Sequence, residues 1–251
     1  MKQTIIVKVG TESLTHFHTS EKVANMVRDI TRLIQKKIRV ILISSGAVGC
    51  GREIVGNKVS KQVLASIGQP ILMGRYADMF QKHQVITAQV LPTHATLEDI
   101  TDHREQFVRT VNEVLDMWAL PIINENDALS TAEMQTLWRG ADNDQNALLI
   151  ARILGATDII LLTNTNGVYR DKTDASSRIK ILRAKNITDA WIQTICGEKS
   201  KSWTGGMQSK LIIGREFAKN GGITHICDGV TSTIYEHIIG YTVWGGTLIK
   251  A

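Results

Sequence analysis

The residue types that could do chemistry gather in four short segments of this chain. The segments are Lys8-Val9-Gly10-Thr11, Ser44-Ser45-Gly46-Ala47-Val48-Gly49-Cys50-Gly51, Asn124-Glu125-Asn126-Asp127 and Thr163-Asn164-Thr165-Asn166-Gly167. Each follows a run of β-branched and apolar residues that predicts a buried strand. Because ligands of α/β proteins bind beyond the carboxyl ends of parallel strands, we expect these segments to line a ligand site.

Lys8 closes the strand-like run Thr4-Ile5-Ile6-Val7 and is followed two residues later by Gly10. A cation at the end of a buried strand needs an anionic partner, and a glycine lets the backbone approach a bound group closely. We hypothesise that the partner is a phosphate. The alternative is a lysine whose methylene stem covers apolar surface while its ammonium group reaches water.

Two glycine-containing turns could bind an anion with their backbone amides. Residues 45–51 lead from a strand into an expected helix, but they match neither GxGxxG nor GxxxxGK[ST], and their glycines could instead permit close packing. Residues 204–210 place Gly205 and Gly206 before an expected helix and Lys210 about one turn inside it. The alternative for this second turn is a flexible loop followed by a surface lysine.

Two acidic segments could hold a polar substrate. Asn124-Glu125-Asn126-Asp127 offers carboxylates and amides suited to an ammonium group, although a surface turn uses the same residue types to satisfy its own backbone. Asp142-Asn143-Asp144 precedes an expected helix. One of these residues can cap the helix, which leaves a carboxylate for another role.

The composition narrows the class of protein. The chain has 251 residues, of which 43% are hydrophobic, so it can bury a full core. Its formal net charge is +5. Its basic residues are dispersed, without an aromatic-basic motif, which argues against a nucleic-acid partner. The three cysteines lie far apart, and His16 and His18 lack a third ligand, so neither a disulfide framework nor a metal site is indicated.

The apolar run nearest the amino terminus is Ile5-Ile6-Val7, which is too short for a secretory signal peptide. No later run approaches the length of a membrane span. We therefore expect a cytoplasmic protein that does not contact a membrane.

Strand-like and helix-like patterns alternate along the chain. Strands are expected at residues 4–7, 39–44, 85–91, 121–124, 158–163 and 223–227, and helices at 20–34, 71–82, 103–118, 143–154 and 207–219. Hairpin or edge strands are expected at 130–137 and 246–249, and an irregular polar stretch at 164–184. The alternation predicts an α/β fold in which helices cover both faces of a mostly parallel sheet.

Taken in order, these segments resemble the amino-acid kinase superfamily, and most closely its glutamate 5-kinase family. The shared sequence motifs are residues 7–11, 44–47, 67–69, 121–127, 142–144, 162–163 and 204–210, and the resemblance spans essentially the whole chain. The Asn-Glu-Asn-Asp element separates this family from carbamate, uridylate and acetylglutamate kinases. The resemblance implies a three-layer αβα sandwich with about eight central strands, in one kinase domain with a substrate lobe (1–156) and an ATP lobe (157–251).

The resemblance also implies an activity. It is the ATP- and Mg²⁺-dependent phosphorylation of the L-glutamate γ-carboxylate in proline biosynthesis, inhibited by proline, in a homodimer or homotetramer. The implied catalytic residues are Lys8, Asp144 and Lys210. The implied substrate-binding residues are Ser45, Gly46, Glu125, Asp127, Asp142 and Asn143. The implied ATP-binding residues are Lys8, Gly10, Thr163, Asn164, Thr204, Gly205, Gly206, Met207 and Lys210.

Four features depart from the family's pattern. Thr163-Asn164 stands where Thr-Asp is usual, residues 130–139 form a longer stretch that includes Trp138, and Asp171-Lys172-Thr173-Asp174 replaces an acidic-proline segment. The chain stops shortly after Gly246-Thr247-Leu248, so we expect no RNA-modification-type (PUA) domain.

Two other functions stay open at this point. One is a kinase of the same fold that phosphorylates another small carboxylate or a phosphate group. The other is a non-catalytic sensor of a nucleotide or amino acid, whose expected signature is the loss of Lys8, Asp144 or Lys210. All three residues are present.

Overall fold

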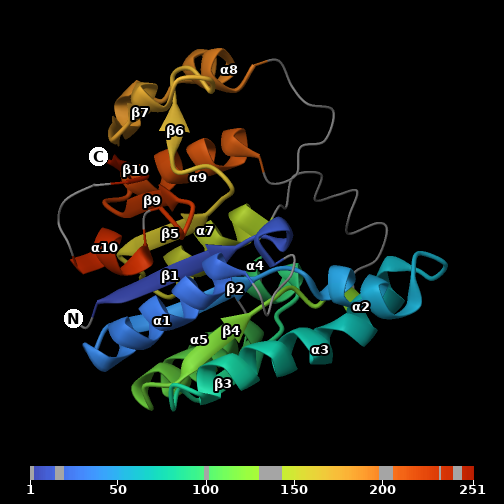
Figure 1. Cartoon of the computed structure of the whole chain (residues 1–251). Coiled ribbons are helices and arrows are strands. Elements are labelled where there is room, and N and C mark those ends of the chain that lie inside the picture. Colours follow the sequence, from blue (N-terminus) through green and yellow to red (C-terminus); the bar gives the residue numbers. More distant parts are fainter. Residues whose placement is uncertain are drawn as a thin grey trace.

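The computed structural model describes residues 3–14, 20–98, 102–129, 143–197, 206–231, 233–239 and 245–251. Within these residues, eight strands form one sheet in the order β3-β4-β2-β1-β5-β9-β10-β8 (Figure 1). Their bounds are β1 Thr4–Val9, β2 Arg39–Ser44, β3 Thr87–Val90, β4 Leu120–Ile123, β5 Asp158–Leu162, β8 Ile181–Arg183, β9 Ile223–Cys227 and β10 Thr247–Lys250. Neighbouring strands from β3 to β9 run parallel, whereas β10 runs antiparallel to β9 and parallel to β8. The predicted mostly parallel sheet is confirmed.

Helices cover both faces of this sheet. The helices are α1 Glu21–Gln35, α2 Ala47–Val55, α3 Lys61–Gln81, α4 His94–Glu98, α5 Asp102–Asp116, α7 Asn143–Ile153, α8 Asp189–Cys196, α9 Met207–Lys219 and α10 Ile234–Ile239. Successive residues of a strand point to opposite faces. Ile5 and Val7 accordingly pack in one core with α1, α3 and α10, and Ile6 packs in the other with α5, α7 and α9. The three-layer αβα prediction is confirmed.

In the connections that the structure describes, four single-turn 3-10 helices lie at Thr11–Leu14, Asp127–Leu129, Ala175–Ser177 and Ala184–Asn186. No helix in the described part of the chain combines the length and the apolar character that crossing a membrane requires.

The α3 helix is longer than its apolar spacing predicts. It begins at Lys61 rather than residue 71, and Ser60 caps it by accepting a hydrogen bond from the Val63 amide at 3.3 Å. Gly68 and Pro70 lie inside the first half of the helix, and both residue types disfavour helix. The predicted start was wrong because packing against α2 outweighs these local preferences.

Two other expectations are corrected near the carboxyl terminus. The segment at 246–249 was expected as a hairpin or edge strand, but β10 lies inside the sheet between β9 and β8. The stretch 164–184 was expected to be irregular, but it contains β6 (Val168–Tyr169) and β7 (Arg178–Ile179), which pair antiparallel, and β8 at the sheet edge. Strands of two or three residues are too short to show a period. Residues 130–137 lie outside the described part.

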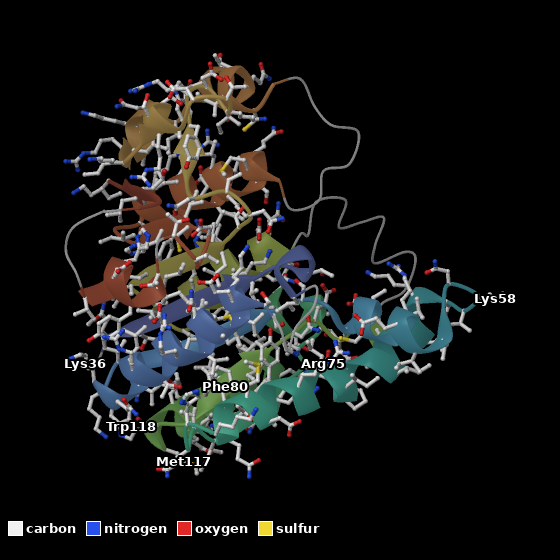
Figure 2. All side chains as sticks on the ribbon, in the orientation of Figure 1. Lys36, Lys58, Arg75, Phe80, Met117 and Trp118 are labelled. Carbon is white, nitrogen blue, oxygen red and sulfur yellow. The ribbon has the colours of Figure 1, made fainter. Side chains whose placement is uncertain are left out.

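Backbone contact at two glycines holds α2 against α3, and the pair projects from the sheet with Lys58 at its tip (Figure 2). A Cβ atom at Gly51 would lie 2.0 Å from the Leu64 carbonyl oxygen, and one at Gly68 would lie 1.8 Å from the Ala47 carbonyl oxygen. Real Cβ atoms do not approach a backbone oxygen this closely. The two positions therefore require glycine, and they fix the start of α2 beside α3.

Gly68→Ala is expected to lower the free energy of unfolding by about 1–3 kcal/mol, because the added methyl group must push the two helices apart. Gly74→Ala is the matched control in the same helix, where a Cβ would meet no atom within 4 Å. It should raise the free energy of unfolding by up to about 1 kcal/mol, since alanine favours helix. Urea unfolding followed by circular dichroism measures both, and equal effects would contradict the close approach.

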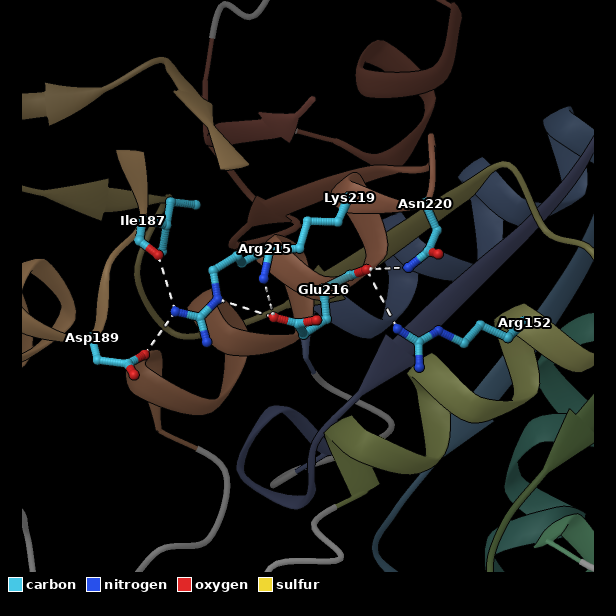
Figure 3. Close-up of polar contacts among 7 residues, drawn as sticks. All are labelled: Arg152, Ile187, Asp189, Arg215, Glu216, Lys219 and Asn220. Atoms are coloured by element: carbon cyan, nitrogen blue, oxygen red, sulfur yellow. Dashed lines mark hydrogen bonds and ion pairs between the residues drawn. The ribbon is translucent and has the colours of Figure 1, made fainter. Parts of the chain in front are cut away.

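The α9 helix is fixed to its neighbours through Arg215 and Glu216 (Figure 3). Arg215 Nη1 donates to the Ile187 carbonyl oxygen at 3.1 Å and lies 2.7 Å from Asp189 Oδ1. Arg152 Nη2 of α7 donates to the Glu216 carbonyl oxygen at 3.4 Å. Single surface contacts of this kind contribute little. The Arg215 contacts hold α9 beside the start of α8, and the Arg152 contact joins α9 to α7. The α7 and α9 helices supply part of the candidate site.

Candidate active site

The candidate loops leave the sheet at one edge because their strands are parallel and in register. Val9 pairs with Ser44 on one side and with Leu162 on the other, and Leu162 pairs with Cys227. Ile123 pairs with Ile43 in the same way. The residues that directly follow these strands, at positions 10, 45, 124 and 163, therefore lie at the same end of the sheet, as the sequence predicts.

Lys8 points into the layer that holds α7 and α9. It lies two residues after Ile6 on β1, so its side chain shares the face on which Ile6 packs against these helices. Lys8 is only 4% exposed. The reading of Lys8 as a lysine that reaches into water is therefore wrong.

The Asp144 carboxylate contacts the ammonium groups of two lysines. Asp144, the second residue of α7, is 0% exposed, and its Oδ1 atom forms an ion pair with Lys8 Nζ. Its Oδ2 atom accepts a hydrogen bond from Lys210 Nζ at 3.1 Å. Lys210 lies in the first turn of α9 and is 5% exposed. The three predicted catalytic residues thus come from three elements and meet in one buried cluster.

The two lysines change the protonation equilibrium of Asp144. Burial raises the pKa of Asp144, but the ammonium groups of Lys8 and Lys210 outweigh burial and hold that pKa below its ordinary value. Asp144 is thus a buried carboxylate that contacts two ammonium groups, one on each of its oxygens. Two ammonium groups placed side by side are also suited to contact an anion such as a phosphoryl group.

The glycines beside the two lysines leave room for such an anion. A Cβ atom at Gly10 would lie 3.9 Å from Lys8 Nζ, so glycine keeps the space next to the ammonium group open. Gly206 immediately precedes Met207, the first residue of α9, and a Cβ there would meet no described atom within 4 Å. Thr204 and Gly205 lie outside the described residues.

Two of the predicted substrate-binding residues, Glu125 and Asp127, line a pocket of about 270 Å³. The pocket is lined by Ala47, Ala65, Ser66, Gln69, Pro70, Gln89, Leu91, Glu125, Asn126, Asp127 and Ala128. Its size suits a small metabolite. Ser45 is buried, and it lies two residues before the lining residue Ala47 in the sequence. Gly46 caps α2 with a φ of 110°, a left-handed conformation that favours glycine. Asp142 lies outside the described residues, and Asn143 is the first residue of α7.

Glu125 and Asp127 have partners that the sequence does not predict. Asn146 Nδ2 donates to Glu125 Oε2 at 3.3 Å, which links the acidic loop to the helix that carries Asp144. Lys61 Nζ lies 3.1 Å from Asp127 Oδ1. The Lys61 side chain is 53% exposed, so the ammonium group of a ligand could replace it at low cost.

The loop after β5 also has an unpredicted contact. Lys22 Nζ of α1 donates to the Thr163 carbonyl oxygen at 2.9 Å and to Asn164 Oδ1 at 3.1 Å. The amide of Asn164 thus accepts from a cation where the resemblance leads one to expect a carboxylate. Lys22 and Lys61 are ordinary lysines in the first turn of a helix, so no local signal in the sequence marks them.

A second buried cluster lies at the opposite end of β5 from these loops. Asp158 is the first residue of β5, and its Oδ1 atom lies 2.9 Å from His225 Nε2. His225 Nδ1 lies 3.3 Å from Nδ1 of His237. Burial, with the adjacent charge of His225 and that of Arg178, lowers the pKa of His237 from 6.5 to about 3.

This low pKa predicts a loss of stability in acid. Between pH 6.5 and about 3 the unfolded chain binds a proton that the folded His237 does not, so the free energy of unfolding falls as the pH falls. His237→Asn should flatten this dependence by up to about 1.4 kcal/mol per pH unit, as measured by urea unfolding from pH 7 to pH 4. The exposed His83 gives the control His83→Asn, which should keep the wild-type slope. An unchanged slope for His237→Asn would contradict the prediction.

The structure is that of an α/β protein with a buried lysine–aspartate cluster near the end of its parallel strands. The chain belongs to the amino acid kinase family, whose model matches residues 3–227.

Within this family, the chain is similar in sequence to curated proteins named glutamate 5-kinase. A glutamate 5-kinase of Picosynechococcus is 35% identical over 246 residues, which cover 92% of this chain and 64% of that protein. Those of Haemophilus influenzae (strain PittGG) and Oleidesulfovibrio alaskensis are each 32% identical and cover 95% and 90% of this chain. The chain spans 68% and 60% of the length of these two relatives.

Solved structures share the fold at low sequence identity. Carbamate kinase from Giardia lamblia bound to AMP-PNP superposes with a TM-score of 0.69 at 15% identity, over 100% of this chain and 99% of that one. N-acetylglutamate synthase from Neisseria gonorrhoeae, complexed with coenzyme A and L-arginine, gives 0.63 at 15% identity, over 99% and 61% of the two chains. These likenesses support the three-layer architecture.

Proposed function

We propose that this protein transfers the γ-phosphoryl group of ATP to the γ-carboxylate of L-glutamate, as the first step of proline biosynthesis. The products are L-glutamyl 5-phosphate and ADP. The observation that carries the proposal is the buried cluster in which the ammonium groups of Lys8 and Lys210 meet at the Asp144 carboxylate. The relatives named glutamate 5-kinase support the choice of acceptor.

In this reaction an oxygen of the γ-carboxylate attacks the γ-phosphorus, and the bond from phosphorus to the oxygen that bridges to the β-phosphate breaks. The transition state spreads negative charge over the equatorial oxygens, so the enzyme must supply positioned cations rather than a covalent nucleophile. Lys8 of β1 and Lys210 of α9 would supply them. The γ-carboxylate is already ionised at neutral pH, so no general base is required.

Asp144 would act as a positioning residue. Its two oxygens contact both ammonium groups, which holds them in one place before the substrate arrives. Groups that are already oriented toward the developing charge need no reorganisation during the reaction, and this is a large source of rate enhancement.

The nucleotide would enter as MgATP. Among the described residues, no group of three acidic, histidine or cysteine side chains could hold a metal. Mg²⁺ often keeps several waters and binds through substrate phosphates, which fits delivery of the ion with ATP. The proposed ATP-binding residues are Lys8, Gly10, Thr163, Asn164, Thr204, Gly205, Gly206, Met207 and Lys210.

Glutamate would bind in the substrate lobe (1–156), and ATP in the carboxyl-terminal lobe (157–251) of the same domain. The proposed glutamate-binding residues are Ser45, Gly46, Glu125, Asp127, Asp142 and Asn143. Proline would compete at the glutamate site. The proposal includes a homodimer or homotetramer in the cytoplasm.

The test measures ADP release from MgATP with L-glutamate, L-aspartate, N-acetyl-L-glutamate, carbamate or uridine monophosphate as the acceptor. Hydroxylamine added to the assay converts an acyl phosphate into a hydroxamate, which shows that a carboxylate was phosphorylated. ADP release and hydroxamate formation with L-glutamate, both reduced by proline, are expected. Turnover only with another acceptor would point to a different kinase of this fold, and ligand binding without any turnover would point to a sensor.

A further inference from the structure

Gln69 holds a buried hydrogen-bond donor that the described part of the protein does not satisfy. The residue is 9% exposed, and its Nε2 atom is buried without a hydrogen-bond partner. Buried polar groups without a partner are rare in native proteins, and each of them requires an explanation.

A chain of amides fixes which end of the Gln69 side chain is the donor. The Glu125 backbone N–H donates to Asn124 Oδ1 at 3.0 Å, and Asn124 Nδ2 donates to Gln69 Oε1 at 2.8 Å. Because the Asn124 oxygen accepts a backbone N–H, the Asn124 amino group must face Gln69. The Gln69 oxygen must then face Asn124, so its amino group is left as the donor without a partner.

Gln69 belongs to the face of α3 that forms one wall of the 270 Å³ pocket. Its neighbours on this wall include Ser66 and Pro70. Proline has no N–H, so Pro70 cannot donate the helical hydrogen bond to the Ser66 carbonyl oxygen. Glu125 and Asp127 also line the pocket, and each has a carboxylate side chain. The lining thus combines one oriented amide donor with several acceptors, a pattern that matches a zwitterion with a carboxylate and an ammonium group.

We infer that the Gln69 side-chain amide binds the α-carboxylate of the amino-acid substrate and helps to select it. This assignment rests on the proposed function, because it names a group of the same substrate. Among the described residues that line the pocket, neither Lys8 nor Asp144 occurs. The pocket therefore receives the end of the substrate that lies away from the transferred phosphoryl group, and that end carries the α-carboxylate and the α-ammonium group.

The test compares two substitutions that remove the donor with one that does not. Gln69→Glu keeps the shape and the acceptor for Asn124 but replaces the donor by an oxygen, and Gln69→Met removes the donor without adding charge. Each should raise the KM for L-glutamate about 10- to 100-fold, the size of effect expected when a hydrogen bond to a charged group is lost. The KM for MgATP should stay within about twofold, and kcat should change less than the glutamate KM. Gln81→Glu, on the exposed last residue of the same helix, controls for the added charge and should match the wild type.

The outcomes separate this inference from the proposed function. Normal turnover of glutamate by the wild type, with an unchanged glutamate KM in both Gln69 variants, would overturn the role of Gln69 alone. No turnover of glutamate by the wild type would remove the proposed function and this assignment with it. Parallel rises in both KM values, or a loss of thermal stability that accounts for the lost activity, would assign Gln69 to folding and contradict the inference.

Discussion

Lys8→Met is expected to lower kcat with L-glutamate and MgATP by about 10²- to 10³-fold, the usual loss when one donor to a transition-state oxyanion is removed. Methionine fills much of the lysine volume but carries no charge. Asp144 then keeps Lys210 as its partner at 3.1 Å, so the variant does not leave an isolated buried carboxylate. The folded state should therefore persist while the phosphoryl group loses one of its two cations.

The matched control for this prediction is Lys36→Met, which removes one positive charge at the exposed end of α1 (Figure 2). Its kcat should equal that of the wild type. ADP release at saturating substrate measures turnover, and thermal unfolding reports whether each variant folds. A folded Lys8→Met enzyme with wild-type kcat would remove Lys8 from the proposed mechanism.

Asp144→Asn is expected to lower the free energy of unfolding by about 3–5 kcal/mol, the typical result when one partner of a buried ion pair is removed. The substitution leaves the ammonium groups of Lys8 and Lys210 buried beside a neutral amide. The two groups repel each other unless one releases its proton, and either outcome costs free energy.

The effect should depend on pH. The pKa of Asp144 is lowered in the folded protein, so its contribution to stability is present at neutral pH and is lost as the pH falls through that lowered value. The difference between wild type and Asp144→Asn should therefore shrink in acid. Urea unfolding at neutral and acidic pH measures it.

Asp116→Asn serves as the control for Asp144→Asn. The Asp116 side chain is 58% exposed and pairs with Arg39 at the surface, so its loss should cost less than about 1 kcal/mol. A destabilisation by Asp144→Asn no larger than that by Asp116→Asn would contradict the burial and pairing of the cluster. Retained wild-type turnover in Asp144→Asn would contradict the positioning role.

Much of the fold follows from local patterns in the sequence. Runs such as Thr4-Ile5-Ile6-Val7 favour buried strands, because they are short, rich in β-branched residues and apolar on both faces. Their alternation with helical patterns then requires a mostly parallel sheet between two helical layers. The pattern does not reach short elements or elements that contain helix-breaking residues, which is why β8 and the first half of α3 are not predicted.

The sequence also predicts which charged groups the site contains, because Lys8, Asp144 and Lys210 are ionisable residue types wherever the chain places them. Only the tertiary structure decides which of these charges meet. The face of β1 on which Lys8 lies and the packing of α9 beside α7 bring two lysines to one carboxylate across about 200 residues of sequence. The unpartnered donor of Gln69, and the lysines that hold Asp127 and Asn164, likewise depend on helices from distant segments lying beside the loops. Local sequence specifies secondary structure and charge, whereas long-range packing specifies distance, and the strength of an ion pair or hydrogen bond depends on distance.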